Sequence, residues 1–201
     1  MKLCALLLVA LTPCLGQPLP ADTNKAFGNP AAAVRLDIFS DFECPACRNF
    51  HMNMLPQIER DYGPTGKLYI VSHEFPLNIP AHKLSREVAA YATAAARIGK
   101  YDVVADALFQ KQPSWYSEAN PQVKFWDIIA GVLTPAEQKK VQALAKDPGV
   151  LAEVQSDVDL GTRLRVDSTP SFFLSHGMQR FSLPWQGLTY PLFRSMVDGM
   201  K

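Results

Sequence analysis

Apolar and polar residues follow two patterns along this chain: short apolar runs near both ends, and stretches with helical spacing between them. The short runs predict buried strands, which we place at 34–39, 67–72, 171–175 and 179–183. The helical stretches predict helices, which we place at 45–62, 85–98, 101–109, 121–130, from 135 onward, 148–163 and 189–200. The predicted order is therefore β-α-β, a block of helices, then β-β-α, which is an α/β fold class.

Three local signals refine these elements. Pro45 suits the first turn of its helix, where a missing N–H costs nothing, whereas Pro56 lies inside the same helix and is expected to kink it. Residues 134–137 (TPAE) form a capping box with proline at the first helical position. The connection between the first two strands is long enough for parallel pairing.

The N-terminal region carries a targeting pattern. Residues 1–16 combine a positively charged start, a short apolar run and a small-residue exit at Gly16, which is typical of a secretory signal peptide. A buried N-terminal element is one alternative; lipid attachment at Cys14 is another, although Pro13 stands where a lipoprotein signal has a small residue. Residues 17–31 are rich in Pro, Asn and Ala without a period and predict a flexible lead-in. We therefore expect a periplasmic or secreted protein.

Composition and charge exclude some classes of function. The chain has 201 residues, with 20 Lys and Arg against 19 Asp and Glu, so no basic excess points to nucleic acid. A chain of this length buries about 70% of its unfolded surface, so its core needs neither disulfides nor a metal. The four cysteines need another explanation, and cleavage near Gly16 would leave only Cys44 and Cys47.

These two cysteines form a Cys-x-x-Cys at the start of the predicted helix 45–62. A bridge over so short a loop gains little as a structural staple, whereas Cys44 at a helix N-terminus meets unpaired N–H groups and the helix dipole, which lower a thiol pKa. Cys47, one turn inside, is expected to be more buried and to hold its proton longer. Two alternatives are an inert structural bridge and a zinc site with His51, which lacks an evident fourth ligand. His51 is also a candidate for tuning the thiolate.

Several segments resemble one known family, in the same order and spacing. They are FSDFECPAC at 39–47, Tyr62 with TGK at 65–67, FPL at 75–77 and STPSFF at 168–173. Over about residues 33–198 the chain resembles the DsbA-like thiol:disulfide oxidoreductases of bacteria. The resemblance implies a thioredoxin-like fold with an all-helical insertion, divided into an N-terminal part at 32–80, the insertion at 81–164 and a C-terminal part at 165–201.

The same resemblance implies roles for individual residues. Thr169–Pro170 is expected to be a cis peptide bond packed against both cysteines, although X–Pro bonds in general are cis in only ~5–6% of cases. Thr169 would offer backbone hydrogen bonds to an extended substrate segment, as in strand addition. Phe42, together with Phe75, is a candidate for an apolar substrate groove.

Two positions depart from the family pattern. Ile38 stands six residues before the first cysteine, where many relatives carry a buried acid that moves protons to the second cysteine. Asp37 is one residue earlier, on the opposite face of a strand, so we expect that relay to be absent. Pro45-Ala46 replaces the Pro-His of strongly oxidising members, and Glu43 adds a negative charge beside the first cysteine. Both changes predict a less stable thiolate and a less oxidising pair.

We therefore predict an exported enzyme that introduces disulfides into other proteins through Cys44 and Cys47, with no cofactor and no metal. Its partners would be unfolded or folding exported proteins with thiols, and a quinone-linked membrane protein that reoxidises it. A disulfide reductase or isomerase is the first alternative, and a non-catalytic binding module is the second. Dimeric isomerases carry a dimerisation domain for which residues 17–31 are too short, so we expect a monomer.

Overall fold

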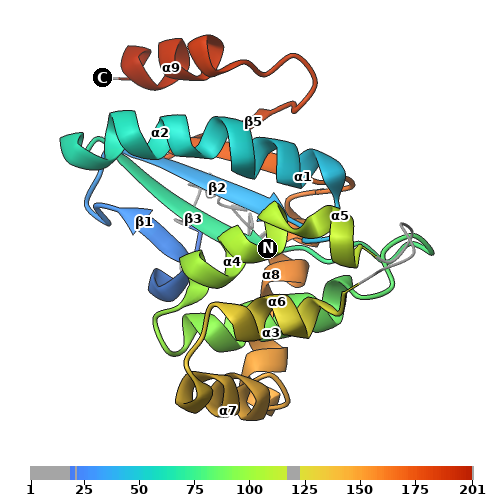
Figure 1. The fold of residues 1–201 in the computed structure, drawn as a ribbon. Coiled ribbons are helices and arrows are strands. Elements are labelled where there is room, and N and C mark those ends of the chain that lie inside the picture. The colour runs from blue at the N-terminus through green and yellow to red at the C-terminus, as the bar shows by residue number, and fades with distance from the viewer. Residues whose placement is uncertain (1–18, 21, 117–122, 201) are drawn as a thin grey trace, which may run out of the picture.

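A central mixed sheet organises the fold (Figure 1). The computed structural model describes residues 19–20, 22–116 and 123–200, so the predicted signal peptide and Cys14 lie outside the described residues. The strands lie in the order β1-β3-β2-β4-β5, with bounds β1 (Ala26–Gly28), β2 (Val34–Ser40), β3 (Leu68–Glu74), β4 (Ser171–His176) and β5 (Gln179–Leu183). The four predicted strands and the parallel pairing of β2 with β3 are confirmed, and the other neighbours are antiparallel.

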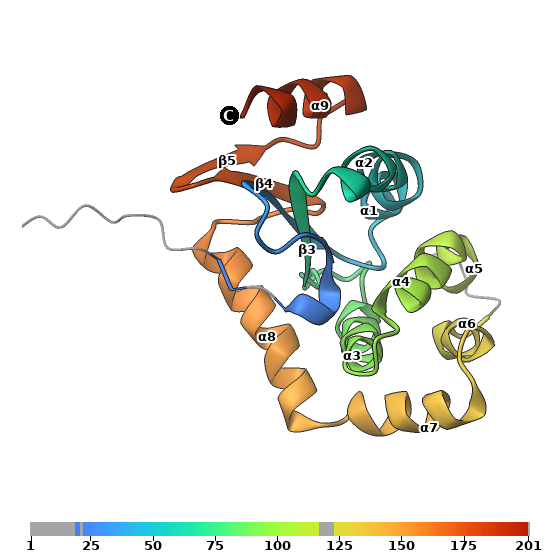
Figure 2. The ribbon, with the colours of Figure 1, turned by 90° about the vertical axis from the view of Figure 1, so that its left-hand side faces the viewer.

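Helices cover both faces of this sheet (Figures 1 and 2). One face is covered by α1 (Pro45–Asn49), α2 (Leu55–Tyr62) and α9 (Tyr190–Gly199). The block between β3 and β4 lies on the other side and consists of α3 (Ser85–Ala96), α4 (Tyr101–Gln110), α5 (Gln112–Trp115), α6 (Phe125–Gly131), α7 (Pro135–Leu144) and α8 (Pro148–Arg163). The predicted α/β class with an all-helical insertion is therefore confirmed. Within the described residues, no helix is long and apolar enough to span a bilayer.

Alternating side chains of β2 divide the core between the two faces. Leu36 and Ile38 pack into the cluster beneath α2 and α9. Phe39 points the other way and packs with Phe75 and Leu160 of the opposite face. This period of two follows from strand geometry, and it gives β2, the middle strand of the sheet, a buried residue on each side.

The predicted helix 45–62 is interrupted. Between α1 and α2 the chain forms a π-helical segment, η2 (Phe50–Met54), and Pro56 lies in the first turn of α2. A proline inside a helix removes one hydrogen bond and conflicts with the carbonyl four residues earlier, so the wider π turn accommodates Pro56. The predicted kink thus takes the form of a change in helix type.

The helices predicted for the insertion are present, except that one of them begins later than predicted. The capping box at Thr134 is confirmed, because its side chain accepts a hydrogen bond from the Glu137 backbone while the Glu137 carboxylate accepts one from the Thr134 N–H. The helix predicted at 121–130 begins at Phe125, and residues 117–122 lie outside the described residues.

The predicted flexible lead-in needs correction. Residues Thr23–Lys25 form a 3₁₀ turn, η1, and β1 adds an edge strand beside β3. Lys25 is only 2% exposed although it carries a charge. A three-residue strand is too short to show a period in the sequence, and its pairing partner lies more than forty residues away, so the pattern alone could not reveal it.

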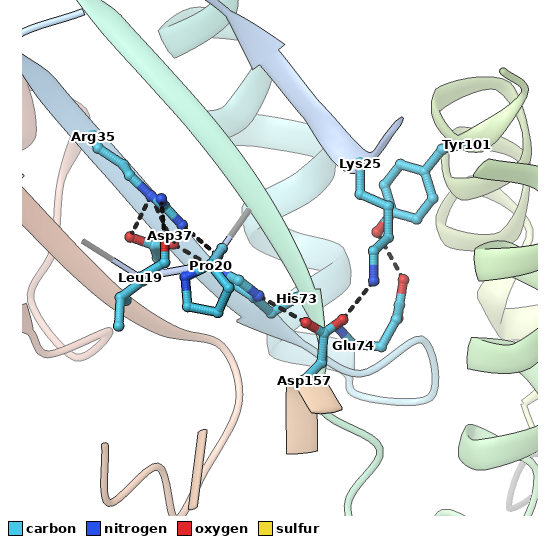
Figure 3. Close-up of polar contacts among 9 residues, drawn as sticks. All are labelled: Leu19, Pro20, Lys25, Arg35, Asp37, His73, Glu74, Tyr101 and Asp157. Carbon is cyan, nitrogen blue, oxygen red and sulfur yellow. Dashed lines mark hydrogen bonds and ion pairs between the residues drawn. The ribbon is translucent and has the colours of Figure 1, made fainter. Parts of the chain in front are cut away.

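A chain of buried ion pairs ties this segment to the sheet and to α8 (Figure 3). Lys25 Nζ lies 2.5 Å from one oxygen of Asp157, and His73 Nδ1 lies 2.9 Å from the other. His73 Nε2 then contacts Asp37 at 2.8 Å, and Asp37 pairs with Arg35 at 2.5 Å. Burial disfavours the charged form of Lys25, but the carboxylates around it, Asp157 first and then Glu74, together outweigh burial and raise the pKa of Lys25.

Neighbouring groups complete this cluster. Tyr101 donates a hydrogen bond of 2.9 Å to Glu74, and burial raises the pKa of Glu74 to about 7. At the other end Arg35 donates to the carbonyls of Leu19 and Pro20. The cluster therefore joins the N-terminal segment, the sheet and the insertion.

Close packing of α8 against the sheet gives a first prediction. A Cβ added at Gly161 would lie 2.5 Å from the ring of Phe75, so we expect Gly161→Ala to lower the free energy of unfolding by about 1–3 kcal/mol, as overpacked cores do. Urea unfolding measures this. Gly131→Ala is the matched control, since its added Cβ meets no described atom within 4 Å; equal stability of the two variants would contradict the close packing.

The buried pair of Lys25 gives a second prediction. Lys25→Met removes one of the two ion-pair partners of Asp157 and leaves His73 as the other; breaking a buried pair in this way costs about 3–5 kcal/mol. Lys67→Met breaks the exposed pair with Asp198, whose side chains are 46% and 43% exposed, and should cost less than about 1 kcal/mol. Unfolding curves in which both variants lose the same stability would show that Lys25 is not part of a buried network.

Candidate redox site

Cys44 occupies the N-cap of α1, as predicted. Its backbone is extended (φ −78°, ψ 119°), and Pro45 takes the first helical position. Cys47 lies one turn further on, inside the helix. The first N–H groups of a helix have no partner within it and favour a negative charge, so Cys44 stands where a thiolate is stabilised.

The turn that delivers Cys44 is shaped by Asp41. The Cys44 N–H donates to the Asp41 carbonyl at 3.1 Å, and the Glu43 N–H donates to the Asp41 carboxylate at 2.8 Å. The Asp41 N–H in turn lies 3.5 Å from the Cys47 sulfur. One residue therefore contacts the backbone of the first cysteine and the sulfur of the second.

The two sulfurs differ in exposure and in pKa. Cys44 is 7% exposed and Cys47 is fully buried, which confirms the predicted order of burial. A hydrogen bond from Cys47, opposed by burial and helped by Thr169 and the N–H groups of Cys47 and Ala46, lowers the pKa of Cys44 to about 6. Burial, followed by the hydrogen bond to Cys44, raises the pKa of Cys47 well above its ordinary value.

The loop before β4 lies against Cys44. The Thr169–Pro170 peptide bond is cis, as predicted, and the Cys44 thiol donates a hydrogen bond of 3.2 Å to the Thr169 carbonyl. The Thr169 hydroxyl is buried and has no hydrogen-bond partner among the described residues. It is therefore available to donate to the Cys44 sulfur when that sulfur carries a charge.

Phe42 packs inside the protein next to the cysteine turn. Its side chain is 2% exposed and packs on Phe109 with ring centroids 4.8 Å apart, so it does not line an open groove, which corrects that part of the expectation. Gln112, which the sequence did not single out, donates to the carbonyls of Phe42 at 2.7 Å and Cys44 at 3.0 Å. A lone glutamine in a helical block carries no sequence signal for this contact.

The structure separates Asp37 from Ile38. Ile38 packs in the apolar cluster under α2 and α9, while Asp37 lies on the other face of β2, bound to His73 and Arg35. The groups that set the pKa of Cys47 are, after burial, Cys44, Ser40 and the Asp41 backbone. Asp37 thus belongs to the ion cluster of Figure 3.

His51 and Glu43 lie beside the site with different partners. His51 Nε2 lies 2.7 Å from Asp106, and its ring packs on Phe109, so it is held on α4. The described residues contain no group of three or more metal-ligating side chains. Glu43 is fully buried and accepts from the Leu84 N–H at 2.7 Å, so its carboxylate points to the start of α3.

Taken together, this arrangement suits exchange between thiols and disulfides. The less buried sulfur, that of Cys44, ionises more easily, and the fully buried sulfur of Cys47 holds a proton. A thiolate of low pKa is both an attacking group near neutral pH and a good leaving group. The geometry thus separates the two chemical tasks between two sulfurs one helical turn apart.

Known proteins resemble this chain in sequence and in fold. A family model described as thioredoxin matches residues 21–188. "Probable disulfide bond formation protein D" of Bacillus cereus is 26% identical over 160 residues, which cover 76% of this chain and 70% of that protein. "Disulfide bond formation protein D" of Bacillus subtilis is 24% identical over 165 residues, covering 80% and 71%. The crystal structure of Wolbachia pipientis alpha-DsbA1 is similar with a TM-score of 0.73 at 22% identity, over 91% of this chain and 92% of that one, which is a likeness of fold.

The contact between the two sulfurs gives a third prediction. Alkylation of reduced protein should follow a Cys44 pKa of about 6, and Cys47→Ala should raise that pKa because it removes the largest stabilising hydrogen bond. The rate of modification by iodoacetamide, followed from about pH 4 to about pH 9, measures the Cys44 pKa in the wild type and in Cys47→Ala. Ordinary reactivity with a pKa of about 8.5 in the wild type would contradict the stabilised thiolate.

Proposed function

Because the chain belongs to the thioredoxin family and is a DsbA-like thiol:disulfide oxidoreductase, we propose that Cys44 and Cys47 are its redox pair and that it introduces disulfides into exported proteins. One arrangement carries this proposal: Cys44 caps α1 beside the carbonyl of Thr169, and Cys47 is fully buried one turn behind it. This placement lowers the pKa of Cys44 to about 6 and raises that of Cys47. A stable Cys44 thiolate favours the reduced pair, so the oxidised pair readily takes up electrons.

The reaction proceeds in two exchanges. A substrate thiolate attacks the Cys44 sulfur of the Cys44–Cys47 disulfide, forming a substrate–Cys44 bond while the broken bond leaves its electron pair on Cys47, which takes up a proton. A second substrate thiolate then attacks the substrate sulfur of this mixed disulfide and releases Cys44 as a thiolate. The substrate gains one disulfide, and two electrons stay on the pair.

Substrate contacts are assigned to the loop before β4. Thr169 and Pro170 adjoin the Cys44 sulfur, and the backbone there suits pairing with an extended segment that carries the reacting cysteine. Phe42 contributes by holding the turn in place on Phe109. Binding of the substrate backbone requires no particular side chain, which suits an enzyme with many substrates.

Residues around the pair tune its potential. Pro45 and Ala46 stand between the cysteines and Glu43 precedes them, so no imidazole adds positive charge within the motif and one carboxylate lies beside it. The Cys44 pKa of about 6 lies between that of thioredoxin, about 7, and that of DsbA, about 3.5. This supports an oxidising but moderate couple.

Export and recycling complete the proposal. The pattern at residues 1–16 supports export to the periplasm or the exterior, where disulfides persist. Reduced enzyme must pass its two electrons on, for which we propose a quinone-linked membrane partner, and we propose that it acts as a monomer.

The reduction potential gives a fourth prediction. We expect a value between about −270 mV, as in thioredoxin, and about −120 mV, as in DsbA, measured by equilibration with glutathione buffers. Ala46→His should raise the potential because it adds a cation beside the thiolate, whereas Ala46→Ser, the control, should change it little. A wild-type reduction potential as high as about −120 mV would contradict the expectation that Ala46 and Glu43 make the pair less oxidising.

The direction of electron flow is tested in cells. Trapping of free thiols should find the wild-type pair mostly oxidised, whereas a mostly reduced pair would favour a reductase or isomerase. Cys44→Ser should abolish either exchange activity. Full activity of Cys44→Ser would instead indicate a non-catalytic binding module.

A further inference from the structure

The Asp41 carboxylate is buried and accepts hydrogen bonds from four groups. Two come from backbone N–H groups, that of Glu43 at 2.8 Å and that of Leu77 at 2.8 Å. The other two come from the Ser85 hydroxyl at 2.5 Å and from His82 Nδ1 at 2.8 Å. These four contacts hold the carboxylate in one position.

Three of these four donors lie at the start of the helical insertion or just before it. Leu77 and His82 lie in the connection between β3 and α3, and Ser85 is the first residue of α3. Asp41 itself contacts the Cys44 N–H and the Cys47 sulfur. Residues at the start of the insertion therefore hold, through Asp41, the turn that carries the redox pair.

Two buried carboxylates at this turn oppose a thiolate. The Ser85 hydroxyl oxygen lies 2.5 Å from the Asp41 carboxylate and 3.0 Å from that of Glu43, and neither residue is more than 1% exposed. Like charges nearby disfavour ionisation, so a cation held at this turn would favour the Cys44 thiolate. His82 contacts the Asp41 carboxylate directly, with Nδ1 at 2.8 Å, and its side chain is 6% exposed.

The surroundings of His82 favour its protonated form. The hydrogen bond to Asp41 raises the pKa of His82 against the effect of burial, and the charges of Asp41, Cys44 and Glu43 raise it further. Tyr116 presents its ring in a T-shaped contact at 6.0 Å. Lys83 and Arg86 line the same pocket of about 870 Å³ as His82.

We propose that His82, held on Asp41 at the start of the insertion, is a positioning residue whose positive charge stabilises the Cys44 thiolate. The proposal rests on the assignment of Cys44 as the reacting thiol. His82 supplies from a distant segment the imidazolium that the Pro-Ala motif lacks. Because the oxidised pair has no thiolate, His82 holds its proton to higher pH in the reduced protein than in the oxidised protein.

The main test removes the charge and keeps the hydrogen bond. The amide of His82→Asn can donate to Asp41 from nearly the position of Nδ1, so the turn stays in place. We expect the Cys44 pKa to rise by about half a unit, which lowers the alkylation rate about threefold below pH 5.5 and leaves it unchanged at pH 9. His51→Asn is the matched control, because His51 also pairs with an aspartate, Asp106, at 2.7 Å, and it should not move the profile.

A reciprocal measurement separates electrostatics from structure. Linkage requires that the Cys44 charge raise the pKa of His82 by the same amount that the His82 charge lowers the pKa of Cys44. NMR titration of the His82 imidazole should therefore give a lower pKa in Cys44→Ser, and in the oxidised wild type, than in the reduced wild type. This arm uses folded wild-type protein even if His82→Asn fails to fold.

The outcomes distinguish the two proposals. An unchanged Cys44 profile in His82→Asn, an equal shift in His51→Asn, or a His82 titration that ignores the redox state would each overturn the role of His82. If wild-type Cys44 instead reacts as an ordinary thiol, the redox assignment fails first. If the wild type exchanges disulfides normally and the Cys44 pH profile of His82→Asn is unchanged, the proposed function stands and only the role of His82 is rejected.

Discussion

The hydrogen bond between the two sulfurs at the N-terminus of α1 is the interaction on which the chemistry of this molecule depends. It lowers the pKa of the accessible Cys44 to about 6 and helps to raise that of the buried Cys47. A thioredoxin-like scaffold needs only a strand, a turn and a helix to create it, since the unpaired N–H groups of the helix supply the remaining stabilisation. The other contacts at the site hold this arrangement or adjust its electrostatics.

The helical insertion has a part in the site as well as in the core. Its first residues bind the Asp41 carboxylate, and Gln112 of α5 binds two carbonyls of the same turn. The sheet and the insertion thus meet at the redox pair, with Cys44 and Cys47 inside the apolar cluster of the insertion. A protein built in this way can alter the reactivity of its thiols through residues far from the Cys-x-x-Cys motif.

The second buried polar cluster plays a different part. Lys25, Asp157 and His73 connect the N-terminal segment with α8 and the sheet (Figure 3), and Asp37 continues the chain on the face of β2 opposite Ile38. Buried pairs of this kind add little net stability over apolar packing, but breaking one is costly. The cluster therefore specifies how the N-terminal segment packs against the sheet. It also engages Asp37, the acidic residue of β2, in ion pairs.

The sequence by itself determined the features that depend on near neighbours. Cys44 at a helix N-cap, Pro45 in the first turn, the capping box at Thr134 and the main strands all follow from local spacing, because caps and periods act over one or two turns. Only the tertiary structure decided that Phe42 is buried, that residues 26–28 join the sheet, and that Gln112 and His82 contact the cysteine turn. These contacts join residues about forty or more positions apart, and a polar side chain shows no pattern that names its partner until packing has brought the two together.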